Sequence, residues 1–271
     1  MNLRCKYSPL FRVAVTGATG YLGLKLLEAF DASDFLDTDF SCVPAGAVII
    51  HLAANMQNSR EALAENMLID THVLEQVNEK HRGLIFASTN NVYPFALNCK
   101  TSDNLRCNDY YSAAKIFAEK LFDDCIKLPF VSIRIADVFG VGQKHGNFFR
   151  AIEQSIRTNN SLSLFGAGSK RRTYIHATEL VLFLKWIAVD GFDLATAKRA
   201  LNVGYSDSAS VLEIVTKVAE HSKLDVIFKS IENDRSHFDI RTMQTSFLSG
   251  YTPKWSSFQE ALTDYVEEIN L

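Results

Sequence analysis

The segment TGATGYLG, Thr16 to Gly23, constrains the fold of this chain more than any other stretch of the sequence. It follows the apolar run FRVAV and leads into LKLLEAF, which predicts the order strand, glycine turn, helix. Its three glycines allow a turn in which the N-terminus of a helix faces an anion such as a pyrophosphate. Such turns also join strands to helices for structural reasons alone, so the motif by itself leaves both interpretations open.

The next apolar run, AVIIHLAA (Ala47 to Ala54), comes early in the chain. A complete nucleotide-binding half of a doubly wound sheet normally has a further strand and helix before this point. The sequence therefore predicts a nucleotide-binding unit that is shortened after its first helix.

Apolar, β-rich runs alternate with helical patterns along the first half of the chain. Strands are expected at 11–16, 47–53, 84–88 and 131–135, with helices at 21–30, 60–80 and 111–126. This alternation predicts an α/β fold with a doubly wound parallel sheet. After residue 140 the pattern changes, and we expect helices at 147–158, 178–189 and 209–221 and a short strand at 201–204.

These changes predict two interleaved domains. Residues 1–145 are expected to form a Rossmann-like nucleotide-binding domain, to which residues 172–204 return. Residues 146–271 are expected to form mainly a smaller C-terminal substrate domain.

The composition excludes several classes of partner. The chain has 271 residues, a formal net charge of −3 and a pI near 6.2, so no overall charge attracts nucleic acid or an anionic membrane. No apolar run is long enough to span a bilayer, and the histidines and cysteines show no metal-binding spacing. The cysteines are odd in number and form no C-x-x-C, so we expect free thiols in a cytoplasmic protein.

The segment YYSAAK, Tyr110 to Lys115, carries a candidate proton donor. Tyr111 and Lys115 are four residues apart and share one helix face, whereas Tyr110 has Ala114 at that spacing. A lysine ammonium beside a phenol lowers the pKa of the phenol, so Tyr111 could exchange a proton with an alcohol or ketone. The alternative is a surface tyrosine that stacks beside a lysine.

The segment FASTNNVYP, Phe86 to Pro94, ends an expected strand in two hydroxyl residues, Ser88 and Thr89. In a doubly wound sheet, ligands bind beyond the carboxyl ends of the strands, where a hydroxyl can hydrogen-bond a substrate oxygen. The alternative is that both hydroxyls cap a turn. The order of the three segments along the chain, glycine turn, hydroxyl and Tyr-Lys pair, favours a catalytic site.

Together these motifs resemble the extended short-chain dehydrogenase/reductases, in particular the NAD-dependent epimerase/dehydratase group that acts on nucleotide sugars. The resemblance runs across nearly the whole chain and rests on TGATGYLG, HLAAN, ENMLIDTHVLEQV, STNNVYP, YSAAK, IRIADVFGVGQ, FGAGSKRRTYIHATEL, LNVGYSDSASVLEI, DRSHFD and SGYTPKWSSFQEAL. It implies a homodimer built on the helices at 60–80 and 111–126.

The resemblance also implies the roles of individual residues. The expected catalytic residues are Thr89, Tyr111 and Lys115. The expected cofactor contacts, besides Tyr111 and Lys115, are Gly17, Thr19, Gly20, Tyr21, Leu22, Gly23, Asp37, Asp39, Phe40, Leu52, Ala53, Ala54 and Asn66. The expected substrate contacts, besides Thr89, are Asn90, Asn91, Asp137, Arg172 and Arg235, with the two arginines on the diphosphate. A basic run such as KRR, Lys170 to Arg172, is otherwise solvated surface or a nucleic-acid contact.

Several positions depart from the family pattern. In the short piece 31–46, Asp37 is a candidate for the ribose carboxylate, about 20 residues after the first glycine of the turn. Asp39 and Phe40 are candidates for the acidic-apolar pair that contacts adenine. Asn90 and Asn91 stand where the dehydratases of the family have Asp and Glu, and amides cannot serve as acid and base. Asp137 and Glu179 stand where many members have Asn and Asp.

The charges near the expected adenosine end favour NAD(H) over NADP(H). Residues 26–59 contain no Lys or Arg but five acidic residues, which would repel a 2′-phosphate. These acids could equally belong to a solvated loop, and an arginine from elsewhere in the chain could fold against them.

Three functions remain open at this stage. A nucleotide-sugar epimerase uses its NAD twice in each turnover and gains from holding it tightly, whereas a 4-keto-sugar reductase must release it. The shortened adenosine side favours the reductase slightly. The third possibility is a non-catalytic nucleotide-binding scaffold, which the shortening favours and the presence of Thr89, Tyr111 and Lys115 opposes.

Overall fold

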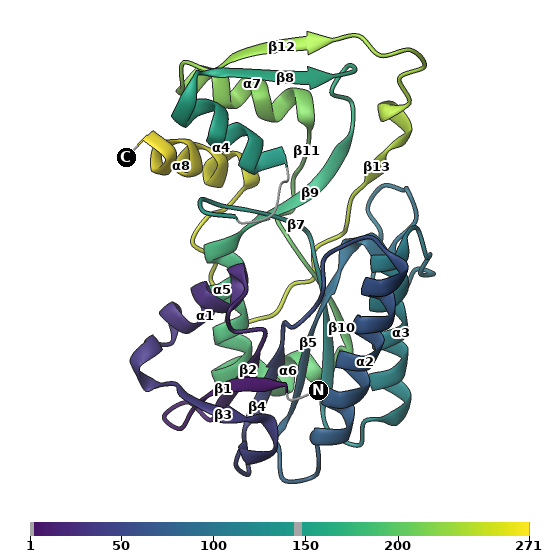
Figure 1. Cartoon of the computed structure of the whole chain (residues 1–271), viewed down its shortest axis with the longest axis vertical. Helices are drawn as coiled ribbons and strands as arrows, with labels where there is room; N and C mark the ends of the chain where they lie inside the picture. The colour runs from purple at the N-terminus through teal and green to yellow at the C-terminus, as the bar shows by residue number, and fades with distance from the viewer. Residues whose placement is uncertain (1–2, 144–147, 271) are drawn as a thin grey trace.

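The computed structural model describes residues 3–143 and 148–270 and has two lobes, one above the other in Figure 1. A seven-stranded sheet forms the centre of the larger lobe, with the strand order β10-β6-β5-β4-β2-β1-β3. Its strands are β1 (Arg4–Ser8), β2 (Val13–Thr16), β3 (Leu36–Asp39), β4 (Val48–His51), β5 (Gly83–Thr89), β6 (Phe130–Ile135) and β10 (Ala200–Val203).

Helices cover both faces of this sheet (Figure 1). On one face lie α2 (Arg60–Gln76) and α3 (Tyr110–Cys125), and on the other lie α1 (Tyr21–Ala29), α5 (Ala177–Trp186) and α6 (Phe192–Thr196). The side chains of β2 alternate accordingly, because Val13 and Val15 join the core beneath α1 and α5, and Ala14 joins the core beneath α2 and α3. The expected doubly wound α/β fold is confirmed.

The four strands expected in the first half of the chain correspond to β2, β4, β5 and β6, and these pair in parallel. The sequence analysis missed β1 and β3. Between α1 and β4 the chain forms only the short 3₁₀ turns η1 (Ala32–Asp34) and η2 (Phe40–Cys42) on either side of β3. The unit is therefore shortened after its first helix, as expected.

Strand β1 fills the gap that this shortening would leave. It lies between β2 and β3 and pairs antiparallel with both. Cys5 lies opposite Thr16 of β2 on one side and Thr38 of β3 on the other. Cys5 and Tyr7 point into the core, which anchors β1 in the sheet.

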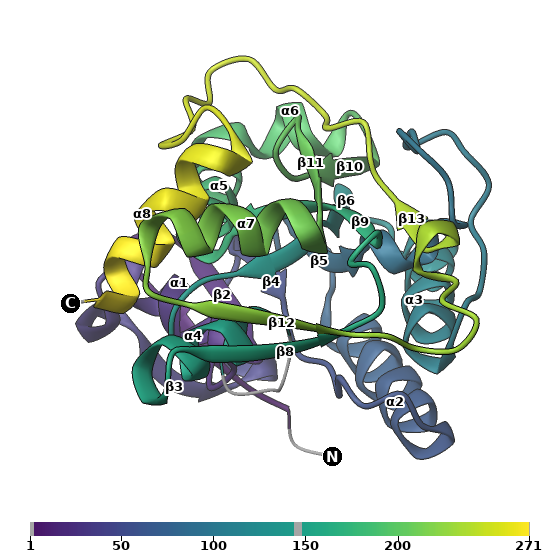
Figure 2. The ribbon, with the colours of Figure 1, turned by 90° about the horizontal axis from the view of Figure 1, so that it is seen from above.

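The smaller lobe has its own sheets and core. Its strands are β7 (Asp137–Phe139), β8 (Ser161–Phe165), β9 (Arg171–His176), β11 (Ser208–Ser210), β12 (Asp225–Lys229) and β13 (Ile240–Arg241). Its helices are α4 (Phe148–Thr158), α7 (Val211–His221) and α8 (Phe258–Asn270). Figure 2 shows α7, α8 and the β8–β12 pair in front of the large sheet when the molecule is seen from above. The expected domain boundary at 145/146 and the first residue of the expected helix 147–158 lie outside the described residues.

The chain crosses between the lobes more than once. After β9 it returns through α5, the π-helical turn η4 (Ile187–Gly191) and α6 to β10, which pairs in parallel with β6 in the large sheet. It then enters the smaller lobe again at β11. The two lobes are therefore interleaved along the sequence.

A buried ion pair joins α3 to the centre of the large sheet. The guanidinium of Arg134 on β6 donates hydrogen bonds to both carboxylate oxygens of Glu119 on α3, the shortest at 2.7 Å. It also donates to the hydroxyl of Tyr93 at 2.8 Å, and Glu119 accepts a bond from Ser88 on β5. Both charged side chains are less than a tenth exposed, so each compensates the other for the loss of its hydration.

We predict that Glu119→Ala lowers the free energy of unfolding by about 3–5 kcal/mol, because Arg134 then remains buried without its carboxylate. Chemical denaturation monitored by circular dichroism measures this loss. The double variant Glu119→Leu/Arg134→Met should be more stable than Glu119→Ala alone, and Lys120→Ala on the exposed face of α3 should have little effect. A Glu119→Ala protein as stable as Lys120→Ala would contradict the prediction.

Candidate active site

The glycine turn lies where β2 ends and α1 begins. Gly17 has a φ of +72°, and a Cβ there would lie 2.6 Å from the backbone nitrogen of Ala53. A Cβ on Gly23 would lie 2.3 Å from the carbonyl oxygen of Gly17, so α1 packs directly on its own turn. Gly20 is the N-cap of α1 and supplies no side-chain cap, and the first turn of the helix carries no acidic residue. The N–H groups in the first turn of this helix have no partner within the helix and can receive a phosphate of a dinucleotide.

The other residues expected at the cofactor surround this turn. Leu52 and Ala53 contact Gly17 through their backbones. Asn66 is buried and exchanges two hydrogen bonds with the backbone of Asn55, at 2.7 and 2.9 Å, which fixes the segment after β4. The remaining expected contacts, Thr19, Tyr21, Leu22 and Ala54, are exposed or half-buried around the same turn and segment.

Tyr21 links the first helix to the loop after β7. Its hydroxyl donates to the carbonyl oxygen of Val141 at 3.2 Å and lies beside Gly140. This contact joins the start of α1 to the segment that leads into the smaller lobe.

Two bases face the acidic segment at the sheet edge, a possibility that the sequence analysis left open for an arginine from elsewhere in the chain. Arg4 and Lys6 of β1 face Asp39 and Asp37 of β3, with nitrogen–oxygen distances of 3.8 and 3.2 Å. Phe40, by contrast, is only 2% exposed and packs in the core. Its ring therefore faces away from any ligand at this edge, and only its backbone is left for an adenine contact.

The start of α3 distinguishes the two tyrosines of YYSAAK. Asp109 caps the helix in a capping box with Ser112, which fixes the first turn. Tyr110 is 44% exposed, and its backbone N–H donates to the side chain of Asn58 at 2.9 Å. Tyr111 is half-buried on the other side and shares a helix face with the buried Lys115. The segment 52–58 thus contacts the glycine turn at one end and the start of α3 at the other.

Lys115 is tied to the strand that carries Thr89. Its ammonium donates to the carbonyl oxygen of Ala87 on β5 at 2.8 Å and lies 4.6 Å from the centre of the Phe86 ring. The centre of the Tyr111 ring is 5.8 Å from the same nitrogen. Thr89 follows Ala87 by two residues at the end of β5. Lys115 therefore connects α3 to β5 close to the candidate catalytic residue Thr89.

The pKa of Tyr111 moves in the direction opposite to the sequence expectation. Burial, together with the carboxylates of Asp109 and Asp70, raises the pKa of Tyr111. Burial also lowers the pKa of Lys115, against the opposing effect of Asp70 and Glu119. The physical reason is that the ammonium is directed at a backbone carbonyl, so loss of solvation outweighs attraction between the two side chains. The Tyr111 hydroxyl therefore keeps its proton to a higher pH than an ordinary tyrosine does.

A chain of polar contacts leads from Thr89 into the smaller lobe. The Thr89 hydroxyl accepts a hydrogen bond from the backbone N–H of Asn91 at 3.2 Å. The side-chain amide of Asn90 donates to Asp137 at 3.0 Å, and Asp137 lies 3.9 Å from Nε of Arg172. Arg172 is 4% exposed and also contacts the carboxylate and the carbonyl oxygen of Asp239. Five of the six expected substrate residues, Thr89, Asn90, Asn91, Asp137 and Arg172, therefore lie together.

Arg241 is a member of this cluster that the sequence analysis missed. It lies opposite Arg172 in the pairing of β13 with β9 and donates to the side chain of Asn91. Its Nε is buried and has no hydrogen-bond partner among the described residues. Burial and the neighbouring Arg172 lower the pKa of Arg241, so an anion between the two guanidiniums would relieve their repulsion. Arg235, the expected second arginine, is exposed at the N-cap of η5 (Ser236–Phe238), and its role remains a prediction.

The sequence analysis also missed a second buried cluster beneath the glycine turn. Nε2 of His51 lies 2.9 Å from the carboxylate of Asp70, and Nδ1 lies 2.6 Å from the hydroxyl of Thr16. All three side chains are buried. The partners of His51 are thus side chains from β2 and α2. Asp70 also acts on both catalytic candidates, since its charge raises the pKa of Lys115 and of Tyr111.

His176 is buried where the two lobes meet. Its ring packs 5.1 Å from that of Phe139 and 4.8 Å from that of Trp255, centre to centre, and its Nδ1 accepts the Thr178 N–H at the start of α5. Burial, with smaller effects from Lys25 and Lys254, lowers the pKa of His176 to about 4. Between about pH 6.5 and pH 4, His176 is therefore protonated in the unfolded chain but not in the folded protein.

We predict that His176 destabilises the fold as the pH falls through this window, by about 3 kcal/mol in all. In urea denaturation at a series of pH values, His176→Asn should flatten the decline of the unfolding free energy, because asparagine keeps an N-cap acceptor but does not titrate. His237→Asn, at an exposed position, serves as the control. An unchanged pH dependence in His176→Asn would assign the acid sensitivity to other groups.

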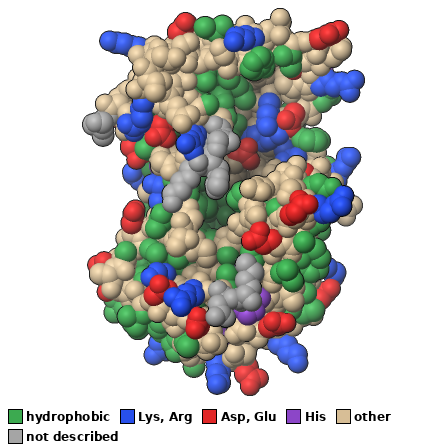
Figure 3. Space-filling model, viewed as in Figure 1, with side chains coloured by type: hydrophobic (Ala, Val, Ile, Leu, Met, Phe, Trp, Pro, Cys, Tyr) green, Lys and Arg blue, Asp and Glu red, His purple; other side chains and the backbone are tan. Residues whose placement is uncertain are grey.

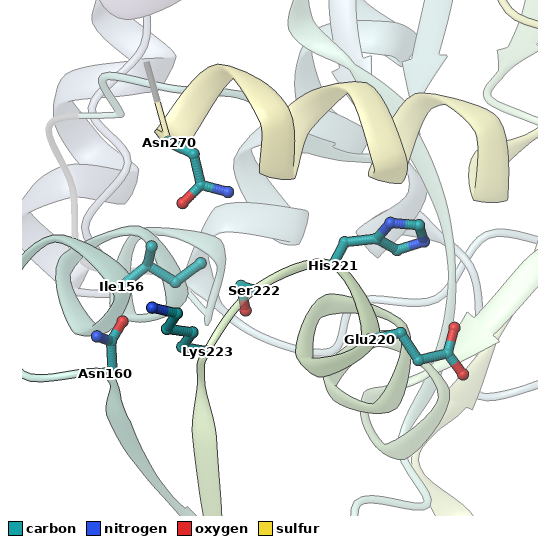
Figure 4. Close-up of a pocket in the computed structure, with 7 residues that line it drawn as sticks. All are labelled: Ile156, Asn160, Glu220, His221, Ser222, Lys223 and Asn270. Carbon is teal, nitrogen blue, oxygen red and sulfur yellow. The ribbon is translucent and has the colours of Figure 1, made fainter.

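Other surface features lie away from these residues. Figure 3 shows a hollow between the two lobes. A separate open pocket of about 510 Å³ lies in the smaller lobe, at the ends of α4, α7 and α8 (Figure 4). It is lined by Ile156, Asn160, Glu220, His221, Ser222, Lys223 and Asn270, none of which belongs to the candidate site. Within residues 3–143 and 148–270, no helix could cross a membrane and no group of three or more His, Cys, Asp or Glu could hold a metal ion.

The chain belongs to the NAD dependent epimerase/dehydratase family. Residues 35–204, more than half of the sequence, match the model of that family. The match begins after the glycine turn, so the assignment of the turn rests on its geometry. No protein of curated function is significantly similar to the chain in sequence.

Solved structures of the same fold cover nearly the whole chain. A UDP-galactose 4-epimerase is 22% identical, with a TM-score of 0.74 over 95% of this chain and 98% of the other. The UDP-glucose 4-epimerase of Thermus thermophilus, in complex with NAD, is 19% identical, with a TM-score of 0.74 over 95% and 98%. An NAD-dependent NDP-hexosamine 5,6-dehydratase is 19% identical, with a TM-score of 0.71 over 94% and 96%. At these identities the likeness concerns the fold.

Proposed function

We propose that this protein catalyses NAD-linked oxidoreduction at a carbon of a nucleoside-diphosphate sugar. The observation that carries the proposal is the position of Tyr111 and Lys115 on one face of α3. The Lys115 ammonium donates a hydrogen bond to the carbonyl oxygen of Ala87 on β5, two residues before Thr89. The glycine turn, joined to α3 through segment 52–58, supplies a phosphate-binding helix start nearby. Bound NAD(H) would accept or supply a hydride, which is the chemistry that the family name implies.

The roles of the side chains follow from their positions. Tyr111 exchanges a proton with the sugar oxygen, and Thr89 orients that oxygen at the end of β5. Lys115 holds α3 against β5 and is the side chain that would hold the nicotinamide ribose. In the smaller lobe, Arg172 and Arg241 pair with the diphosphate of the nucleotide sugar, and Arg235 is a further candidate.

A keto-sugar reductase is the first choice among the reactions of this family. The adenosine side consists of the short, largely exposed strand β3 and two 3₁₀ turns, which favours a cofactor that exchanges. Asn90 and Asn91 are bonded to Asp137 and Arg241 and offer no carboxyl group for elimination of water, which disfavours a dehydratase.

An epimerase is the second candidate, because a UDP-galactose 4-epimerase and a UDP-glucose 4-epimerase share this fold. The two reactions differ in their use of NAD. An epimerase retains NAD through purification, whereas a reductase oxidises NADH in proportion to the keto sugar consumed. A non-catalytic scaffold would show neither behaviour, and a thermal-shift screen with nucleotides and nucleotide sugars, with and without NAD(H), separates these cases.

We also propose which lobe binds each ligand, how the protein assembles and in which compartment it acts. We assign the dinucleotide to the larger lobe and the nucleotide sugar mainly to the smaller lobe. A homodimer would form on α2 and α3, where Leu68 of α2 is 67% exposed. The unpaired cysteines support a reducing compartment such as the cytoplasm.

We predict that Tyr111→Phe lowers turnover by about 10²–10⁴-fold, the usual contribution of general acid–base catalysis. The change removes one hydroxyl and keeps the ring, so the fold and NADH binding should persist. The measurement is NADH oxidation with a panel of nucleoside-diphosphate 4-keto sugars. Tyr110→Phe is the matched control, because Tyr110 is exposed and has no lysine one turn on. Equal rates for the two variants would exclude Tyr111 as the proton donor.

We predict that Arg172→Ala weakens the binding of nucleotide sugars by at least about tenfold and leaves the affinity for NADH nearly unchanged. Arg172 faces Asp137 and Arg241 across the site, whereas its neighbour Arg171 points to Glu213 and Ser208. Arg171→Ala is therefore the control. Calorimetric titration with both ligands measures the two affinities, and equal losses for both would place Arg172 in a purely structural role.

A further inference from the structure

Strand β1 brings a base to the edge of the sheet at which dinucleotides bind. In doubly wound folds of order 3-2-1-4-5-6, the strand beside the first one runs parallel to it. Here that position belongs to β1, which runs antiparallel, so its amino end rather than its carboxyl end reaches this edge. Because Cys5 lies opposite Thr16, Arg4 lies level with Gly17, the first residue of the glycine turn.

An acidic partner reaches the same edge from β3. Arg4 lies opposite Asp39 in the register of β1 and β3, and Nε of Arg4 is 3.8 Å from the carboxylate. The second pair, Lys6 and Asp37, lies two residues further inside, level with Val15. The register therefore favours Asp39 over Asp37 as the carboxylate at the ligand edge.

The carboxylate of Asp39 and the guanidinium of Arg4 favour different dinucleotides. A carboxylate here accepts hydrogen bonds from the 2′-hydroxyl of an adenosine ribose, and an arginine accommodates a 2′-phosphate. Arg4 and Asp39 are 73% and 55% exposed, and an exposed pair of this kind is weak. Either side chain can therefore turn to a ligand when the other is removed.

We propose that the Arg4–Asp39 pair determines which dinucleotide this protein accepts at the ribose 2′ position. Asp39 favours NAD(H) by accepting the ribose hydroxyls, by repelling a 2′-phosphate and by holding Arg4. Removal of the Asp39 charge frees Arg4 for the 2′-phosphate of NADP(H). This inference rests on the proposed NAD-linked function and names the residues that set its cofactor specificity.

The test is titration of NADH and NADPH into the full chain, followed by protein or nicotinamide fluorescence, with the ratio of the two dissociation constants as the readout. Asp39→Asn should shift the ratio toward NADPH by about tenfold, and Arg4→Ala should shift it toward NADH. Any loss of an adenine contact affects both ligands equally and cancels in the ratio. Lys6→Ala, which removes the base of the inner pair, and Lys120→Ala, on the exposed face of α3, are the controls and should leave the ratio unchanged.

The outcomes separate this inference from the proposed function. If Asp39→Asn and Arg4→Ala change the ratio no more than the two controls, the inference is wrong while the cofactor site stands. If the unmodified protein binds neither dinucleotide, the proposed function fails and the inference fails with it. Circular dichroism spectra of the four variants verify that the edge of the sheet is intact in each.

Discussion

The ion pair between Glu119 and Arg134 holds the candidate catalytic helix against the sheet. Glu119 lies one helical turn after Lys115 on α3, and Arg134 lies on β6. Through Ser88 and Tyr93 the same pair contacts the end of β5 and the loop that follows it. Two charges buried this deeply are stable only in the arrangement that pairs them, so they fix the position of α3 relative to the strand that ends in Thr89. The placement of Lys115 over β5 follows from this constraint.

The features that could be predicted from the sequence are those fixed by residues close together along the chain. Spacing alone identified the glycine turn, the hydroxyl at the end of β5 and the shared helix face of Tyr111 and Lys115. The alternation of polar and apolar residues in RCKYS was a signal for a strand, but its insertion between β2 and β3 depends on pairing across the sheet. Likewise, Arg241 and Asp70 owe their positions to partners far away in sequence, Asn91 and His51.

The direction of the Tyr111 pKa shows the same limit. A lysine four residues away indicates proximity, but its effect on the pKa depends on where its ammonium points. In the folded chain the nearest acceptor is a carbonyl oxygen of β5, and burial dominates. The sequence therefore predicted that Tyr111 and Lys115 share a helix, whereas the pKa shifts of both side chains depend on the tertiary structure.

The antiparallel insertion of β1 also changes how this edge of the protein can assemble. A parallel strand needs a crossover through a helix before it pairs, whereas β1 reaches β2 through a short turn and meets β3 soon after α1. Residues 4–16 thus form two sheet strands from contacts that are near in sequence, which lowers the entropy cost of closing the loop between them. At this edge the pairing of β1 with β2 is therefore a local hairpin, which closes a shorter loop than a parallel crossover requires.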